Sequence, residues 1–172
     1  MLQINKNYIL IIFFFFFVQE SFSQQNKHNT IGSFAAWEAY YWDTEEGKIC
    51  SIMSIPIKEE GDYKKRGEVY TQVSINSNAS RAGVVSVQAG YTFKNQSEVE
   101  INIDNKNTVL LFTHERMAWA KSAEEDSKLI KFMKLGNSMI TKGISSRGTN
   151  TKDTYSLKGF SAAYKAMGHV CK

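Results

Sequence analysis

The residues that could carry out acid–base or metal chemistry are few and widely spaced. The chain of 172 residues contains three histidines and two cysteines: His28, His114, His169, Cys50 and Cys171. A zinc site usually takes neighbouring ligands from positions such as i and i+3 or i+4, and none of the three histidines has a second histidine or cysteine at that spacing. His114-Glu115 begins like the metalloprotease motif His-Glu-x-x-His, but Ala118 stands where the second histidine would be. We therefore predict no catalytic residues, no metal site and no cofactor.

Carboxylates are abundant, but their positions do not single out a catalytic pair. Glu45-Glu46 and Glu59-Glu60 fall in predicted loops, and Glu124-Glu125 falls at the start of a predicted helix, where the helix dipole alone favours acids. The Gly-x-Ser-x-Gly, phosphate-loop and EF-hand motifs do not occur in the sequence. A glycosidase, however, uses two carboxylates that meet only in the folded protein. We predict a protein that is not an enzyme, with a small periplasmic hydrolase of unknown substrate as the alternative.

The N-terminus has the composition of a secretory signal. An apolar run over residues 8–18, with phenylalanine at every position from 13 to 17, follows Lys6 and the amino terminus. As a helix this run reaches only about 16 Å, whereas a bilayer core is about 30 Å thick. Ser21 and Ser23 provide the small residues of a cleavage site. The pattern predicts removal of residues 1–23 and export of the rest, and the alternative is an uncleaved membrane anchor.

The two cysteines, Cys50 and Cys171, lie near the two ends of the exported region. An even number of cysteines in an exported chain favours a disulfide. The bridge would close a loop of about 120 residues, for which the chain-entropy model gives roughly 4–5 kcal/mol of stabilisation. The competing interpretations are two buried free thiols or one ligand of a metal site. We predict the disulfide, because there is no Cys-x-x-Cys pattern and no histidine near Cys50.

The charge distribution argues against nucleic acid as a partner. The signal contains one lysine and one glutamate, so its removal leaves the formal net charge at +4. Nucleic-acid-binding domains usually gather their basic residues on one face. Here the only basic triplet, at residues 64–66, stands among acidic residues: Glu59, Glu60, Asp62 and Glu68. We interpret this segment as a solvated loop.

Apolar and polar residues alternate in most of the exported region, which predicts antiparallel strands. The clearest strand is 99–103, and similar patterns occur at 49–57, 69–75 and 85–93. Ile49, Met53, Ile55 and Ile57 are expected on the apolar face of the segment at 49–57, with Lys48, Cys50 and Ser54 on the other. Two helices are also predicted. One begins with the capping box at Ser122, and the other covers residues 160–167. About six strands, a helix, two strands and a helix predict a mainly β sandwich with helices at its edge.

The first predicted strand, over residues 34–42, has aromatic residues on both faces. Trp37, Ala39 and Tyr41 share one face, so Tyr40 and Trp42 lie on the other. Exposed aromatic side chains are common anchors of binding surfaces. Tyr40 and Trp42 are therefore a candidate binding patch. The alternative is that the second helix or the C-terminal tail covers them, because the predicted disulfide draws the C-terminus towards the neighbouring strand.

A set of short segments occurs in a fixed order between residues 33 and 171. They are Trp37-Glu38-Ala39-Tyr40, Lys48-Ile49-Cys50, Lys65-Arg66-Gly67-Glu68-Val69-Tyr70, Ala89-Gly90-Tyr91-Thr92-Phe93, Ile103-Asp104, Met117-Ala118-Trp119-Ala120, Ser145-Ser146-Arg147-Gly148-Thr149, Thr154-Tyr155-Ser156-Leu157 and Gly159-Phe160-Ser161-Ala162-Ala163. With them the region resembles the invasion-associated locus B family of bacterial exported proteins. The family's usual Phe-Gly-Asp-Trp opening is replaced here by Phe34-Ala35-Ala36-Trp37.

The resemblance implies an immunoglobulin-like antiparallel β-sandwich in the periplasm or at the outer membrane, in a family associated with host-cell invasion. It brings no catalytic residues to carry over. We expect a signal peptide at 1–23, a flexible leader at 24–32 and a sandwich domain at 33–172. The expected function is that of a non-catalytic cell-envelope protein that binds an envelope or host protein. Nucleic acid is not expected as a partner, nor is a transmembrane anchor after signal cleavage.

Overall fold

The computed structural model describes residues 28–78 and 83–171. The predicted signal peptide and its cleavage site lie outside these residues, as does the first part of the predicted leader. In the part of the chain that is described, no helix combines the length and the apolar character needed to cross a membrane.

The described residues form eleven strands and two helices, and every strand pairing is antiparallel. The strands are β1 (Asn29–Phe34), β2 (Trp37–Thr44), β3 (Gly47–Ser54), β4 (Lys58–Gly61), β5 (Val69–Asn76), β6 (Val84–Ala89), β7 (Glu98–Ile103), β8 (Asn107–His114), β9 (Met117–Trp119), β10 (Ser138–Ile144) and β11 (Asn150–Ser156). The helices are α1 (Ala123–Leu135) and α2 (Phe160–Val170). The mainly β, antiparallel fold class with two short helices is confirmed.

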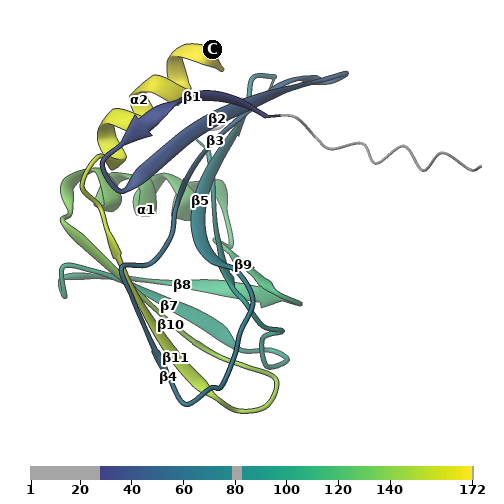
Figure 1. The fold of residues 1–172 in the computed structure, drawn as a ribbon, viewed down its shortest axis with the longest axis vertical. Coiled ribbons are helices and arrows are strands. Elements are labelled where there is room, and N and C mark those ends of the chain that lie inside the picture. The colour runs from purple at the N-terminus through teal and green to yellow at the C-terminus, as the bar shows by residue number, and fades with distance from the viewer. Residues whose placement is uncertain (1–27, 79–82, 172) are drawn as a thin grey trace, which may run out of the picture.

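The described strands form one sheet in the order β1-β2-β3-β5-β6-β9-β8-β7-β10-β11-β4. The sheet curves strongly, with β1, β2, β3 and β5 in the upper part of Figure 1 and β7, β8, β10, β11 and β4 in the lower part. Both helices lie on its inner side, and α2 packs against β1, β2 and β3. The two layers of the sandwich thus belong to one continuous sheet, whose inner face and helices enclose the core.

The core lies where the inner face of the sheet meets the helices. Trp37 of β2 is fully buried, and its indole Nε1 donates a hydrogen bond to the carbonyl oxygen of Ser156 at 3.0 Å. Its ring meets that of Phe160, the first residue of α2, edge to face at 4.9 Å between centroids. The alternating pattern of β7 is realised as predicted, because Val99, Ile101 and Ile103 all point into this core.

Helix α1 begins as its capping box predicts. The Ser122 hydroxyl accepts a hydrogen bond from the Glu125 amide at 3.2 Å, and the Glu125 carboxylate accepts one from the Lys121 amide at 2.9 Å. Near this end, the buried carboxylate of Asp126 accepts a hydrogen bond from the Val85 amide at 2.8 Å. This hydrogen bond fixes the helix to the start of β6. Leu129 and neighbouring apolar residues of the helix pack into the core.

The predicted disulfide is present and ties the end of α2 to the sheet. Cys50 of β3 and Cys171 are bonded, with 6.0 Å between their Cα atoms and a sequence separation of 121. Both side chains are buried on the inner face. The bond therefore clamps α2 onto β3 at the upper end of the molecule in Figure 1.

The N-terminal strands differ from the prediction in their boundaries. Residues 29–32, which we assigned to the flexible leader, instead belong to β1 and pair with β2. The chain reverses at Ala35, whose φ is +54°, so residues 34–42 are not one strand. Two side chains of this polar segment, Ile31 and Phe34, pack on the core. That contact supplies a reason for an otherwise polar stretch to become an edge strand.

The predicted face of β3 is also wrong. Cys50 and Ile52 are fully buried on the inner face, whereas Ile49 and Met53 lie half-buried on the outer one. Ile55 and Ile57 follow the end of the strand and are about two-thirds exposed, at 66% and 69%. The disulfide decides the orientation, because Cys50 must face α2, and successive residues of a strand point to opposite faces.

Candidate functional site

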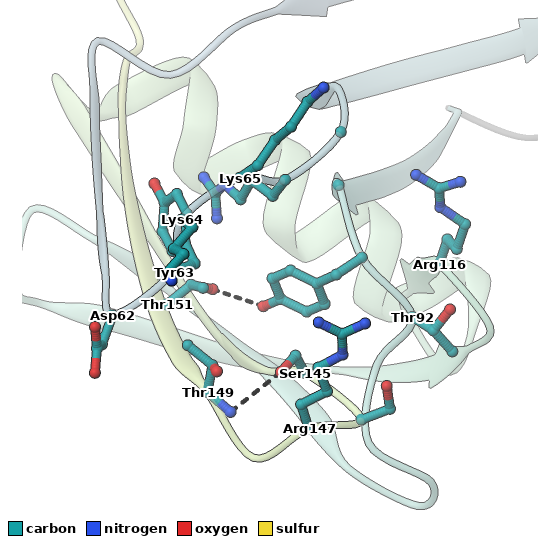
Figure 2. A pocket seen from close by; sticks show the side chains of 15 residues that line it. Asp62, Tyr63, Lys64, Lys65, Thr92, Arg116, Ser145, Arg147, Thr149 and Thr151 are labelled. Atoms are coloured by element: carbon teal, nitrogen blue, oxygen red, sulfur yellow. Dashed lines mark hydrogen bonds between the residues drawn. The ribbon is translucent and has the colours of Figure 1, made fainter.

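Four loops of the described chain meet at one end of the sheet and enclose an open cavity of about 730 Å³. They are residues 62–68 between β4 and β5, 90–97 between β6 and β7, 115–116 between β8 and β9, and 145–149 between β10 and β11. This end of the sheet is at the bottom of Figure 1, away from α2 and the disulfide. Figure 2 shows that basic and hydroxyl side chains from separate loops face one another across the cavity, which we call the basic cavity.

Arg66 fixes the loop of residues 62–68 to the sheet. Its side chain is only 4% exposed, and its guanidinium forms an ion pair with the buried Asp153 of β11. Nε also donates to the Glu59 carboxylate of β4 at 3.0 Å, and the guanidinium carbon lies 4.8 Å from the centre of the Tyr63 ring. These contacts hold the two preceding residues, Lys64 and Lys65, at the wall of the basic cavity.

Burial and charge act in opposite directions on Arg66. Burial by itself lowers the pKa of the guanidinium, but the hydrogen bonds and negative charges of Asp153 and Glu59 outweigh it and raise the pKa above its usual range. Arg66 is therefore a permanent cation that is neutralised by two carboxylates. Its Nη1 nitrogen is buried and has no hydrogen-bond partner among the described atoms. One nitrogen of this lining residue can therefore still donate a hydrogen bond.

The loop of residues 145–149 presents Arg147 at its tip. The Ser145 hydroxyl accepts a hydrogen bond from the Thr149 amide at 3.1 Å, and the Ser145 amide donates to the Thr149 carbonyl at 2.9 Å. The Ser146 amide donates to the Thr92 carbonyl at 2.8 Å, which ties this loop to the neighbouring one. Gly148 adopts φ +85°, a left-handed conformation that favours glycine. In Figure 2 the guanidinium of Arg147 points into the space between the loops.

Two glycines allow the loops to approach closely at the floor of the basic cavity. The Gly67 amide donates to the Gly90 carbonyl at 2.8 Å, and a Cβ on Gly90, whose φ is +74°, would lie 2.5 Å from the Gly67 carbonyl oxygen. A Cβ on Gly67 would lie 2.8 Å from Nη2 of Arg116. The guanidinium of Arg116 therefore rests against the backbone of Gly67, and any side chain there would displace it.

Tyr91 forms the wall that joins these loops to β11. Its hydroxyl lies 2.6 Å from the hydroxyl of Thr151, as the dashed line in Figure 2 shows, and its ring packs edge to face on Phe93 at 5.2 Å. Burial raises the pKa of the Tyr91 phenol, so it stays neutral at neutral pH. It is thus a hydrogen-bonding group and not a charge.

The basic cavity contains uncompensated positive charge. Of the described residues, four cationic side chains in the lining have no ion-pair partner: Lys64, Lys65, Arg116 and Arg147. The one carboxylate in the lining, Asp62, is exposed and lies at the edge of Figure 2, on the side opposite Arg116. Such a site can hold an anion through arginine forks, lysine ammonium groups and hydroxyls.

The lining of the basic cavity does not pair an acid with a base or a nucleophile. The three histidines lie outside the lining and are all exposed. The Ser145 hydroxyl is occupied by the Thr149 amide, and no imidazole or carboxylate among the described residues contacts it. Within residues 28–78 and 83–171, no group of three histidine, cysteine, aspartate or glutamate side chains could hold a metal ion.

The predicted aromatic patch lies elsewhere, on the outer face of β2. Tyr40 and Trp42 are half-buried and stack with 6.0 Å between ring centroids, and the His28 ring lies 5.2 Å from that of Tyr40. Helix α2 packs on the opposite face of this strand, against Trp37. Tyr40 and Trp42 thus lie together on the outer face, whereas α2 packs on the inner face; neither residue lines the basic cavity.

Sequence reasoning missed the basic cavity, although its residues were in view. The segment at 64–66 was interpreted as a solvated loop, whereas the Arg66 side chain is buried and only the two lysines are exposed. Arg116 and Arg147 stand alone among uncharged or acidic neighbours, so no basic cluster marks them in the sequence. Three of the segments that carry the family resemblance, at 65–70, 89–93 and 145–149, contribute residues to the lining of the basic cavity. Their shared membership in that set was the one sequence feature that could have pointed to the site.

Comparison with known proteins agrees with this fold. The family model described as "Invasion associated locus B (IalB) protein" matches residues 37–168. Among solved structures, the crystal structure of invasion associated protein B from Bartonella henselae is similar, with a TM-score of 0.60 and 16% sequence identity. The similarity covers 83% of this chain and 96% of the Bartonella chain. A search of curated proteins finds no significant match.

Proposed function

This chain belongs to the invasion associated locus B family, and from that membership we propose that it is an exported cell-envelope protein that acts through binding and not through catalysis. The mature protein would begin near Gln24, after removal of residues 1–23, and would work in the periplasm or at the outer membrane. Its partner would be a component of the envelope or of a host cell.

Two features support export. The short apolar run at residues 8–18 has the composition of a signal peptide. The Cys50–Cys171 disulfide fits a compartment where disulfides form and persist, such as the periplasm. A protein kept in the reducing cytosol would gain nothing from a bond that depends on oxidation.

The observation that carries the binding function is the charge in the basic cavity. Four loops position cations that have no partner within the described chain, next to hydroxyl groups and without an acid–base pair. Like charges held near one another destabilise the folded protein, so their positions favour a role with an external ligand. The Tyr40–Trp42 patch is a second candidate surface, suited to contact with a protein.

Export is tested by fractionating cells and sequencing the N-terminus of the protein. We expect the envelope fraction to contain a chain that begins near Gln24, with the peptides of Cys50 and Cys171 linked under non-reducing conditions. An intact Met1 in the membrane pellet, or two alkylatable thiols in natively prepared protein, would contradict the proposal.

Binding without catalysis is tested with the purified mature protein and a soluble extract of the envelope. After incubation and gel filtration, mass spectrometry should find compounds retained by the protein and recovered with unchanged masses. The Arg147→Ala variant should retain less of them, while Lys131→Ala, which removes an exposed lysine of α1, should behave like the wild type. Time-dependent conversion of an extract compound by the wild type would instead favour the hydrolase.

A further inference from the structure

We infer that the basic cavity binds a ligand through a phosphate group with at least two negative charges, such as a phosphate monoester or a pyrophosphate. This inference rests on the proposed binding function and assigns the chemistry of its ligand. Four features support it: the number of unpaired cations, the hydrogen-bonded loop and glycine contact that place the arginines, the buried donor of Arg66 and the concave shape of the site.

The number of cations selects a multiply charged anion. Among the residues described, Lys64, Lys65, Arg116 and Arg147 line the basic cavity without an ion-pair partner, and Asp62 supplies one negative charge at its edge. A single carboxylate would leave most of this positive charge uncompensated. A phosphate monoester carries close to two negative charges at neutral pH and a pyrophosphate carries more, which matches the surplus better.

The two arginines stand on loops whose backbones are fixed, and both guanidinium groups are accessible to phosphate oxygens. Arg147 stands at the tip of a loop closed by three hydrogen bonds involving Ser145 and tied to the Thr92 carbonyl. Arg116 rests on Gly67, with no room for a Cβ between them. Arginine binds phosphate through two parallel hydrogen bonds, and a loop backbone that is already ordered loses little freedom on binding.

Arg66 adds an independent reason to place a ligand here. Its side chain lines the basic cavity, is 96% buried and is held by Glu59 and Asp153, yet its Nη1 donor has no partner. A buried donor without a hydrogen bond is costly. An oxygen-rich ligand that reached this nitrogen would satisfy it, while Tyr91 and Thr151 would offer neutral hydroxyls beside it.

The shape of the site is compatible with two sources of the phosphate group, a soluble compound and a lipid headgroup. With a volume of about 730 Å³ the cavity is open and concave, large enough for a phosphorylated compound or for the headgroup of one lipid. Both sources present the same doubly charged group to the same arginines. The probes below are chosen to separate them.

The test is calorimetric titration of the mature protein with inorganic pyrophosphate, and with citrate at equal ionic strength. Pyrophosphate should bind and citrate should bind at least about tenfold more weakly. Arg147→Ala should weaken pyrophosphate binding roughly tenfold to a hundredfold, the value of one or two charge-assisted hydrogen bonds. Arg147→Lys should recover only part of the loss, because lysine lacks the fork, and Lys131→Ala should match the wild type.

Vesicles then distinguish the sources. Phosphatidylcholine vesicles with phosphatidic acid, whose headgroup is a monoester, are compared with vesicles that contain phosphatidylglycerol, a singly charged diester. Binding to the former that pyrophosphate displaces would assign the headgroup. Pyrophosphate binding without vesicle binding would assign a soluble phosphate compound, and either result supports the inference.

Several outcomes would overturn it. These are no pyrophosphate binding by a folded wild type, equal binding of citrate, or an Arg147→Ala variant with wild-type circular dichroism and unchanged affinity. If pyrophosphate fails while envelope compounds are still retained, the phosphate assignment falls and the proposed function stands. If a retained compound is converted to a product, the proposed function falls while the phosphate site can still be measured.

Discussion

The outer face of the sheet and the basic cavity both carry charged side chains, but these side chains form ion pairs on the outer face and are mostly unpaired in the cavity. On the outer face of the sheet, lysines pair with glutamates. Lys152–Glu60 and Lys142–Glu100 are cross-strand pairs, Lys58–Glu60 lies within β4, and Lys121, beyond β9, pairs with Glu98. In the basic cavity the described cations other than Arg66 have no such partners. Cross-strand pairs of opposite charge stabilise a sheet, so the unpaired group of cations is explained better by a ligand than by folding.

One short strand separates these two regions. Glu59 and Glu60 of β4 point to opposite faces, as adjacent strand residues must. Glu60 lies in the outer ladder with Lys58 and Lys152, whereas Glu59 reaches inwards to Arg66. The inner contact is completed by Asp153 of β11, next to Lys152. Alternation along two paired strands thus builds a stabilising ladder on one face and anchors the cavity loop on the other.

The largest effect is expected where the charge pair is buried. Asp153→Asn should lower the free energy of unfolding by about 3–5 kcal/mol, because it leaves the guanidinium of Arg66 buried with only Glu59 as counter-charge. Urea denaturation followed by tryptophan fluorescence measures this. Glu60→Gln is the control on the outer face of the same sheet edge. Equal losses for both variants would contradict the distinction between the two faces.

The aromatic residues of β2 sharpen the comparison of the two faces. Trp37→Ala should cost about 3–5 kcal/mol, because the ring is fully buried against Phe160. Trp42→Ala should cost less, roughly 1–2 kcal/mol, since its half-buried ring loses mainly the stack on Tyr40. Thermal unfolding of both variants measures the two losses of stability and shows whether they differ. A loss for Trp42→Ala as large as for Trp37→Ala would make it a core residue and end its candidacy as a binding patch.

The outer ladder should be weak pair by pair. Lys142→Ala is expected to lower the free energy of unfolding by less than about 1 kcal/mol, because both partners of the 2.8 Å Lys142–Glu100 pair are partly exposed. The double variant with Glu100→Ala should show little further loss. A coupling energy of several kcal/mol in this double-mutant cycle would show that the ladder is more than a set of surface pairs.

The smallest effect, and the one of unusual sign, is expected in the basic cavity. Lys65→Gln removes one of four neighbouring unpaired cations, so stability should stay within about 0.5 kcal/mol of wild type and rise slightly at low salt. The gain should fade at 0.15 M salt, where the screening length is about 8 Å. A clear loss of stability at low salt would mean that Lys65 has a stabilising partner in the fold.

Several features of the fold could be predicted because they depend on neighbours in sequence. The strand at 99–103 follows from strict alternation, and its Val99, Ile101 and Ile103 are buried as that pattern requires. Helix α1 follows from its capping box. The short strands β1, β4 and β9 were missed, so nine strands of the described chain precede α1 where about six were expected. Their residues show little alternation, and pairing with neighbours makes them strands.

The candidate site was far less predictable, because its parts meet only through the sheet. The segments that supply Arg66, Arg116 and Arg147 lie on strands and loops brought together by long-range pairing. Whether a cation is unpaired is also a tertiary property. Arg66 looks like its neighbour Lys65 in the sequence, yet Asp153, 87 residues away, buries and neutralises it. The binding role of Tyr40 and Trp42 stays a prediction.

The sequence by itself determined the class of this protein: a mainly β chain with two helices, cysteines placed to bridge, and an N-terminal segment typical of export. Those conclusions rest on periodicity and composition, which act over a few residues and need no partner. Only the tertiary structure decided which face of β3 is buried, which charges are paired and where a cavity forms. Burial and ion pairing depend on distances between segments far apart in the chain, and the fold alone sets those distances.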